Sequence, residues 1–232
     1  MSHPFRRAVF VALCLLLAAA FTALGVWQVE RRAWKLDLIR RVEARAHAPA
    51  APLPQRAAWD NEQAYQRVRV RGTFLHDRET QVQALTERGA GWWVLTPLRS
   101  DRGTVLVNRG FVPAERRDPA TRRVARPGDT VTVTGLLRAS EPGGGFLRSN
   151  DPAGDRWYSR DVPAIARARR LDDVLPFFVD ADAAPNPGGY PVGGLTVIAF
   201  PNNHLVYALT WFALAGLSIT GAVLALRSKA SP

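Results

Sequence analysis

Two long stretches of the chain contain no charged residue, and they limit the possible folds more than any other feature. The stretches are residues 8–27, AVFVALCLLLAAAFTALGVW, and residues 205–226, LVYALTWFALAGLSITGAVLAL. About 20 apolar residues in a helix, rising ~1.5 Å per residue, cross a hydrocarbon core ~30 Å thick. We therefore predict a membrane protein of α + β class. Transmembrane helices 8–27 and 204–226 would flank an extramembrane domain of residues 28–203.

The first stretch has a second interpretation as a secretory signal. Arg6 and Arg7 precede the apolar run, and Ala18-Ala19-Ala20 offers small residues for cleavage. The run continues to Trp27, which is longer than the apolar core of a usual signal. An uncleaved helix is the favoured prediction, and cleavage stays the alternative.

The distribution of basic residues predicts the orientation of the spans. Residues 171–226 contain no Lys or Arg, whereas Arg227 and Lys229 follow the second span directly. Because basic residues stay on the cytoplasmic side, we predict cytoplasmic tails at residues 1–7 and 227–232. The central domain would then face the periplasm, or the equivalent outer compartment, from an inner (cell) membrane. The first span has arginines on both sides and decides nothing.

Composition excludes several classes of function. The chain has 31 Lys+Arg against 20 Asp+Glu, and arginine supplies nearly all the positive charge, as in proteins from GC-rich genomes. No nucleic-acid-binding motif accompanies this charge, so no nucleic acid is expected as a partner. The single cysteine, Cys14, excludes a disulfide within the chain, a paired-thiolate zinc site and catalysis by a thiol pair.

The region between the spans carries strand patterns. YQRVRVRGTF (65–74) alternates valine with arginine, and TVTVTGLL (130–137) is rich in β-branched residues. Residues 91–100 and 102–113 flank a turn signal, Ser100-Asp101-Arg102-Gly103, that is typical of a hairpin. With further strands at 79–85 and 175–183, we predict a mainly antiparallel β domain of roughly six strands, packed as a small barrel or sandwich. EPGGGFL, residues 141–147, is predicted as a loop.

Two helices are predicted within this central region. Residues 28–46 repeat apolar side chains at helical spacing and form a short amphipathic helix that continues out of the first span. Residues 48–55, APAAPLPQ, form a semi-rigid connector. A second, short helix begins near Asp161, with Pro163 in its first turn.

Motifs for enzymatic chemistry are absent from the sequence. The histidines outside the second span have no metal-binding spacing, and neither GxSxG nor a phosphate-binding glycine pattern occurs. Asp151, Asp155 and Asp161 are close in sequence, but solvated loop charges and helix caps explain them better than catalysis. We expect no enzymatic activity, and a membrane-anchored enzyme is the least favoured interpretation.

The start of the second span carries a candidate binding site. His204, Tyr207 and Trp211 recur at helical spacing over two turns. Imidazole is a usual axial ligand of haem iron, so His204 is the candidate metal ligand, with Tyr207 and Trp211 as neighbours of the macrocycle. The alternative is that His204 and Trp211 only anchor the helix at the membrane surface.

The predicted topology brings the end of the first span to the same depth as His204. Trp27 could lie against a flat ring, and Gln28 lies beside it in sequence. Arg31 or Arg32 could pair with the propionates of a haem.

Four motifs, in the same order along nearly the whole chain, resemble the Surfeit locus protein 1 family. They are LGVWQVERRAWK (24–35), GWWVLTPL (91–98), VLVNRGFVP (105–113) and NNHLVYALTWFALA (202–215). The resemblance implies a membrane factor without turnover of its own that assists assembly of haem A-containing cytochrome c oxidase. Its implied partners are oxidase subunit I, other assembly factors and membrane lipids. One departure is Phe111, where the family commonly has tryptophan.

The resemblance also implies a cofactor, haem a, which bacterial members are thought to bind. The family's histidine falls on His204 and its following tryptophan on Trp211, while its Trp-Gln pair and arginine fall on Trp27, Gln28 and Arg31. The alternative is a membrane-anchored scaffold for oxidase subunits that binds no cofactor. In the third motif, Asn108 and Gly110 are expected to shape a turn or bulge, and Arg109 to pair internally.

Overall fold

Two long helices make up the first of two compact units in the chain. The computed structural model describes residues 3–125, 130–145, 147–186, 188–198 and 200–228. Helix α1 spans His3–His47 and helix α3 spans His204–Arg227, within a unit of Met1–Arg41 and Ala199–Pro232. The predicted span 8–27 and the predicted amphipathic helix 28–46 are one continuous helix, because no proline or glycine interrupts residues 28–46.

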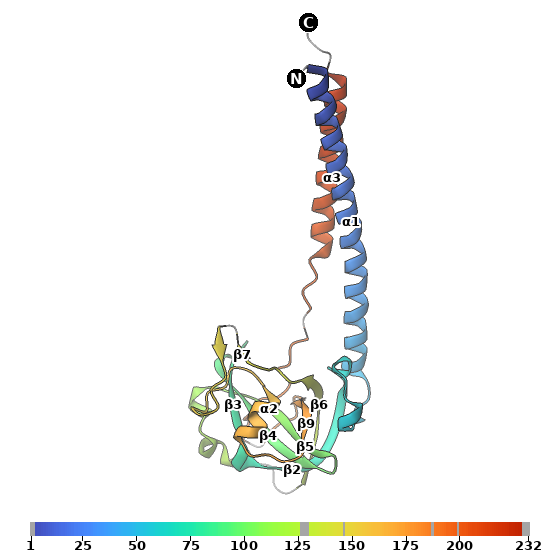
Figure 1. The fold of residues 1–232 in the computed structure, drawn as a ribbon. Helices are drawn as coiled ribbons and strands as arrows, with labels where there is room; N and C mark the ends of the chain where they lie inside the picture. The colour runs from blue at the N-terminus through green and yellow to red at the C-terminus, as the bar shows by residue number, and fades with distance from the viewer. Residues whose placement is uncertain (1–2, 126–129, 146, 187, 199, 229–232) are drawn as a thin grey trace. The chain divides into compact units, whose positions relative to one another are not determined.

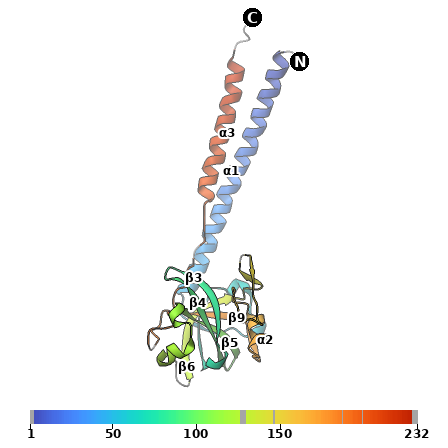
Figure 2. The ribbon, with the colours of Figure 1, turned by 90° about the vertical axis from the view of Figure 1, so that its left-hand side faces the viewer.

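Helices α1 and α3 lie side by side (Figures 1 and 2). Small residues form their contact. The fully buried residues of α3 are Ala208, Ala215 and Ala222, spaced seven apart. A seven-residue repeat keeps one helix face on a neighbour when two helices coil around each other. Within the apolar part of α1 the buried positions are Cys14, Ala18 and Gly25. Small side chains at these positions let the two backbones approach closely.

The two helices run antiparallel. The Arg7 side chain donates a hydrogen bond to the carbonyl oxygen of Leu226 at one end of the pair, and Gln28 meets His204 at the other end. Large apolar side chains, such as Leu16 and Leu217, point away from this contact and are exposed. Both helices are long and apolar enough to cross a membrane by length and composition. An exposed apolar surface of this kind fits a membrane protein.

The second unit, Val42–Ile198, is built on a sheet. Its main strands are β1 (Ala51–Pro52), β2 (Arg67–Phe74), β3 (Thr80–Thr86), β4 (Gly89–Ser100), β5 (Gly103–Val112), β6 (Thr130–Ala139) and β9 (Val174–Ala181). A small hairpin pairs β7 (Gly144–Gly145) with β8 (Arg148–Ser149), and α2 spans Val162–Ala168. Short 3₁₀ helices are η1 (Arg56–Ala58), η2 (Asn61–Gln63), η3 (His76–Arg78), η4 (Ala114–Arg116) and η5 (Pro119–Ala125).

The main sheet closes on itself. Its order is β1-β2-β6-β9-β5-β4-β3, and β4 also pairs with β2, so β2, β6, β9, β5 and β4 form a ring (Figures 1 and 2). The long strand β4 makes this closure, because its first half pairs with β3 and its last residues pair with β2. Most pairs are antiparallel, while β1–β2 and β5–β9 are parallel. The predicted small, mainly antiparallel β domain is confirmed, in its barrel form.

Two apolar clusters explain why β5 is buried along nearly its whole length. Val105 and Val107 point into the barrel, where they pack with Phe177 and other residues. Leu106, one position out of phase, points to the outer face and packs with Ile165 of α2 and with Trp157. Because α2 covers this outer face, both faces of β5 are apolar, and the strand does not alternate as a half-exposed strand would.

Most local predictions between the helices are confirmed. Asp161 caps α2 and accepts a hydrogen bond from the backbone N–H of Ala164 at 3.0 Å. Ser100 pairs with Gly103 across the predicted hairpin turn, and Gly103 has a φ of +113°. The prediction of 141–147 as a loop was incomplete, since Gly144–Gly145 forms strand β7. The two-residue strand β1 was not predicted.

Candidate functional site

His204 begins α3 and contacts Gln28 of α1. The imidazole Nδ1 lies 2.7 Å from Oε1 of the Gln28 amide. An amide oxygen can only accept a hydrogen bond, so Nδ1 is the donor, and the lone pair of a neutral imidazole is then on Nε2. The His204 side chain is half-buried. An imidazole oriented through one nitrogen, with the other nitrogen unprotonated, has the form of a metal-ligating histidine.

Trp211 lies on the same face of α3 as His204 and stacks on an aromatic ring of α1. Its ring centroid is 5.6 Å from that of Phe21, with 25° between the planes. Sequence analysis did not identify Phe21 as part of this region. The seven-residue spacing between Phe21 and Gln28 could have identified it, because that spacing places both residues on one helix face.

Close packing of the helices continues between these two contacts. A Cβ added to Gly25 would lie 2.6 Å from the nearest ring carbon of Phe212. The absent side chain of Gly25 therefore makes room for a ring from α3, one turn before Gln28. Gln28 and His204 thus meet at the end of a packed helix pair.

The remaining predicted site residues lie around this contact rather than in it. Trp27 and Tyr207 are 52% and 55% exposed. Arg31 is exposed, and its guanidinium carbon lies 4.0 Å from the ring centroid of Trp34. Arg32 is half-buried, four residues after Gln28 and on the same helix face. The structure brings His204 to Gln28 and does not bring Trp27 or Tyr207 to that contact.

A further cation lies on this face and was missed by sequence analysis. Lys35, seven residues after Gln28, places its Nζ 5.3 Å from the ring centroid of Phe200. Gln28, Arg32 and Lys35 therefore follow one stripe of α1 beyond the apolar run. This stripe supplies positive charge next to an oriented imidazole, which suits an anionic ligand with a metal centre.

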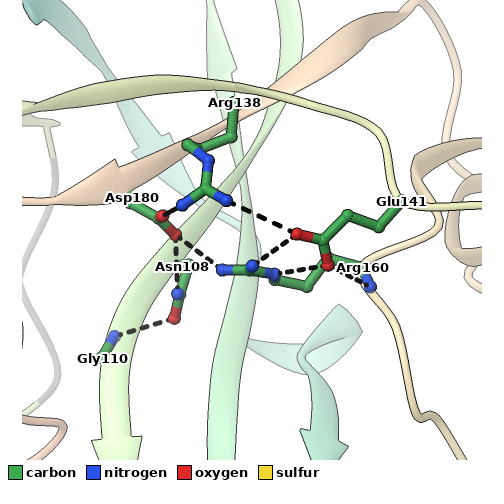
Figure 3. A network of polar contacts seen from close by, with 6 residues as sticks. All are labelled: Asn108, Gly110, Arg138, Glu141, Arg160 and Asp180. Carbon is green, nitrogen blue, oxygen red and sulfur yellow. Dashed lines mark hydrogen bonds and ion pairs between the residues drawn. The ribbon is translucent and has the colours of Figure 1, made fainter. Parts of the chain in front are cut away.

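The β domain holds a second polar group, centred on Asp180 (Figure 3). The Asp180 side chain is 2% exposed. It accepts hydrogen bonds from Asn108 at 2.8 Å, from Arg138 at 2.6 Å and from Arg160 at 3.2 Å. Arg160 also donates two hydrogen bonds to Glu141, through Nε and Nη2. Two carboxylates and two guanidiniums thus form a charge-balanced network that links β5, β6 and β9.

The network shifts the ionisation of its members. Burial raises the pKa of Glu141, but hydrogen bonds and charge from Arg160, with the charge of Arg138, outweigh it and hold that pKa below its usual 4.5. Burial acts to lower the pKa of Arg160, and the charges of Asp180 and Glu141 overcome it, so the pKa is raised. Glu141 and Arg160 are therefore both charged near neutral pH.

Glu141→Gln is expected to make the free energy of unfolding depend less on pH in the acid range. A folded-state pKa below 4.5 means that the carboxylate stabilises the fold above that pH, and that this contribution is lost as pH falls through the folded pKa. The difference in free energy of unfolding between wild type and variant should shrink steadily below about pH 4.5. Urea denaturation between pH 3 and pH 6 measures it, with Glu87→Gln, an exposed glutamate, as control. A difference that stays constant with pH would contradict this role of Glu141.

The expected bulge in the third motif is present. The pairing register between β4 and β5 changes between Trp93 and Leu95, because β5 has one extra residue around Gly110. The side-chain oxygen of Asn108 accepts a hydrogen bond from the backbone N–H of Gly110 at 3.1 Å. Arg109 is buried and lies over the ring of Phe74, 5.1 Å from its centroid. These residues shape the barrel, as the structural interpretation of the motif predicts.

Within the described ranges of the chain, no group of three or more His, Cys, Asp or Glu side chains is placed to hold a metal ion. A metal held by a single imidazole and completed by its own macrocycle needs no such group.

Comparison with known proteins places the chain in a family. A family model described as "SURF1 family" matches residues 15–216. Mouse Surfeit locus protein 1 is 37% identical over 217 residues, which cover 86% of this chain and 70% of that protein. The human protein of the same name is 36% identical over 219 residues, covering 87% and 72%. A SURF1-like protein of Monosiga brevicollis is 38% identical over 210 residues, covering 84% and 79%.

The matched region takes in residues 15–47 of α1, residues 204–216 of α3 and the whole β domain. Gln28, His204 and Trp211 all lie inside it. The chain therefore belongs to the SURF1 family, whose members are cytochrome c oxidase assembly factors.

Proposed function

We propose that this chain assists assembly of haem A-containing cytochrome c oxidase by holding haem a at His204. The observation that carries the proposal is the 2.7 Å contact between Nδ1 of His204 and Oε1 of Gln28. It places a donor hydrogen on Nδ1 and orients the ring, so that Nε2 of a neutral imidazole would be the ligand atom. Imidazole ligands of metals are commonly oriented in this way by a second hydrogen bond.

Each residue of the site has a separate part in this proposal. His204 would supply a nitrogen ligand to the iron, and Gln28 would orient that imidazole. Arg31 or Arg32 pairs with the propionates. Trp211 would contribute aromatic surface on the contact face, whereas Trp27 and Tyr207 lie outside the Gln28–His204 contact and would meet the ligand only from exposed positions. When bound, haem a supplies an iron with a coordination position that an imidazole can fill.

The proposed setting is the inner (cell) membrane, with the β domain in the periplasm and both tails in the cytoplasm. The antiparallel arrangement of α1 and α3 supports it, because Arg7 meets Leu226 and both helix ends then lie on the same side. Arg227 directly after α3 supports a cytoplasmic C-terminus. The proposed partners are oxidase subunit I, other assembly factors and the surrounding lipids.

A scaffold for oxidase subunits that binds no cofactor is the second candidate function. The contact between His204 and Gln28 also fits this function, since a hydrogen bond between the two side chains can serve simply to join α1 and α3. The two candidates differ in whether Nε2 of His204 has a ligand, which a spectrum can decide.

His204→Ala is expected to remove haem a from the purified protein. The full chain is purified in detergent from cells that make haem A, and its absorption spectrum is recorded. Gln28→Leu keeps the size of the side chain but not the acceptor, and should weaken haem retention by about 10–100-fold, as loss of such an orienting partner usually does. The matched control is Asn203→Ala, since Asn203 precedes α3 without a side-chain capping bond.

Unchanged haem content in His204→Ala would refute ligation by this residue. Retention of oxidase subunits in pull-downs, together with full oxidase activity in that variant, would favour the scaffold function instead.

A further inference from the structure

Four arginines on the outer surface of the barrel have no carboxylate partner among the residues that the structure describes. Arg69 and Arg71 lie on β2, Arg99 on β4 and Arg102 in the turn between β4 and β5. All four side chains are exposed. We call this group the β2 arginine surface. It accounts for part of the arginine excess that composition alone attributed to the genome.

Strand geometry places Arg69, Arg71 and Arg99 on one face, and Arg102 lines the same pocket as Arg69 and Arg71. Along β2, buried and exposed residues alternate, so Arg69 and Arg71 both point outward. Thr73 pairs directly with Arg99 of β4, which puts Arg99 on the same face and diagonal to Arg71. The turn that carries Arg102 follows β4 directly, two residues after Ser100.

The neighbouring strand does not neutralise this charge. Arg69 pairs with Thr134 of β6, and Arg71 pairs with Thr132. Threonine hydroxyls therefore flank the arginines where a sheet surface could have carried glutamate or aspartate. Elsewhere in the domain arginines have such partners, as in the pair Arg67–Asp182 at the start of the same strand. Like charges side by side without partners are unfavourable in the free protein.

A pocket beside these arginines has an apolar floor. It has a volume of about 290 Å³ and is lined by Pro52, Leu53 and Val70 together with Arg69, Arg71 and Arg102. Asp101 is the acidic residue at its rim. The pocket can take an apolar side chain between groups that bind the arginines.

We propose that the β2 arginine surface binds an extended acidic segment of a partner protein. Arginines at alternate positions of a strand are about 6.8 Å apart, the spacing of alternate side chains in an extended peptide. Carboxylates at that spacing can each meet a guanidinium, and a side chain between them can enter the pocket. A row of cations with an apolar recess fits such a segment better than a single phosphate headgroup, which needs donors that converge on one point. This surface is separate from His204 and does not depend on the proposed haem site.

The test uses the full chain in neutral detergent and a fluorescein-labelled eight-residue peptide with glutamate at every second position. Fluorescence polarisation should show binding that weakens as salt is raised. The double variant Arg69→Gln/Arg71→Gln should bind about tenfold more weakly, the sum expected for two exposed ion pairs. The control Arg88→Gln/Arg167→Gln removes two other exposed arginines and should bind as wild type does.

Three results would overturn the proposal. The first is equal weakening by the control variant, which would mean attraction to net charge alone. The second is equal binding of a peptide with glutamine in place of glutamate. The third is binding of short-chain phosphatidylglycerol, but not of the peptide, which would make this a lipid surface. If the first double variant fails to fold, Arg99→Gln/Arg102→Gln tests the same surface and should lose binding to a similar extent.

Discussion

Replacing Asp180 with alanine is expected to lower the free energy of unfolding of the β domain by about 3–5 kcal/mol. The Asp180 carboxylate is 2% exposed and bonds to Arg138, Arg160 and Asn108. Its removal leaves two guanidiniums, 16% and 15% exposed, without their shared counter-ion. Leaving buried charge unpaired costs far more than losing an exposed ion pair. Arg160 would keep Glu141, and this limits the loss.

Circular dichroism during urea denaturation of the full chain in detergent measures this change. Asp172→Ala is the matched control, because Asp172 is an exposed aspartate close by in sequence and should cost less than about 0.5 kcal/mol. Asp180→Asn keeps the shape of the side chain but not its charge, and should also destabilise the domain. Equal stability of Asp180→Ala and Asp172→Ala would show that the network contributes nothing to folding.

Gly110→Ala is expected to destabilise the domain by about 2–4 kcal/mol, through strain and a lost strand contact. Gly110 has a φ of +127°, in the region that favours glycine. A Cβ there would lie 2.1 Å from the backbone oxygen of Val192. That oxygen accepts a hydrogen bond from the N–H of Phe111 at 2.9 Å, and Val192 N–H donates one back to Phe111 at 2.9 Å. The new methyl group must push this backbone segment away.

Gly89→Ala separates the effect of backbone strain from the effect of the clash with Val192. Gly89 has a φ of +94° but no atom within 4 Å of an added Cβ, so it reports backbone strain alone. Its expected cost is about 1 kcal/mol. Thermal unfolding of both variants gives the comparison. If Gly110→Ala loses no more stability than Gly89→Ala, the backbone at Val192 moves away from the new methyl group without a measurable loss of stability.

Most strands of the domain are predictable because their sequence patterns are local. In β2 the alternation of valine and arginine matches its observed alternation of buried and exposed residues. Aspartate before a proline-containing helical turn marks the start of α2. The closure of the barrel could not be predicted in this way. It depends on the pairing of β4 with β2, and a local sequence pattern does not indicate which strand a segment pairs with. Strand β1, with two residues, is too short to leave a periodic signal.

At the candidate site, sequence analysis places Gln28 and His204 at one depth, and the structure brings them into contact. The orientation of the other aromatic residues depends on the rotation of each helix about its axis, which the seven-residue repeat of small side chains sets. Reading that repeat would have placed Phe21 and Lys35 on the contact face and Trp27 outside it. The Asp180 network was not predicted from the sequence. Asp180 was counted only among the acidic residues before the second span, although its place within an apolar strand indicates a buried carboxylate.

The position of β9 in the chain has a consequence for biosynthesis. β9 is the last strand of the ring, and it lies between β6 and β5, which both precede it. It also carries Asp180, the shared counter-ion of Arg138 and Arg160. During translation, therefore, the nascent domain cannot complete its hydrogen-bonded ring or bring Asp180 to these two arginines until residue 181 has left the ribosome. Until then the emerging polypeptide presents open strand edges, the state in which newly made β proteins depend most on chaperones.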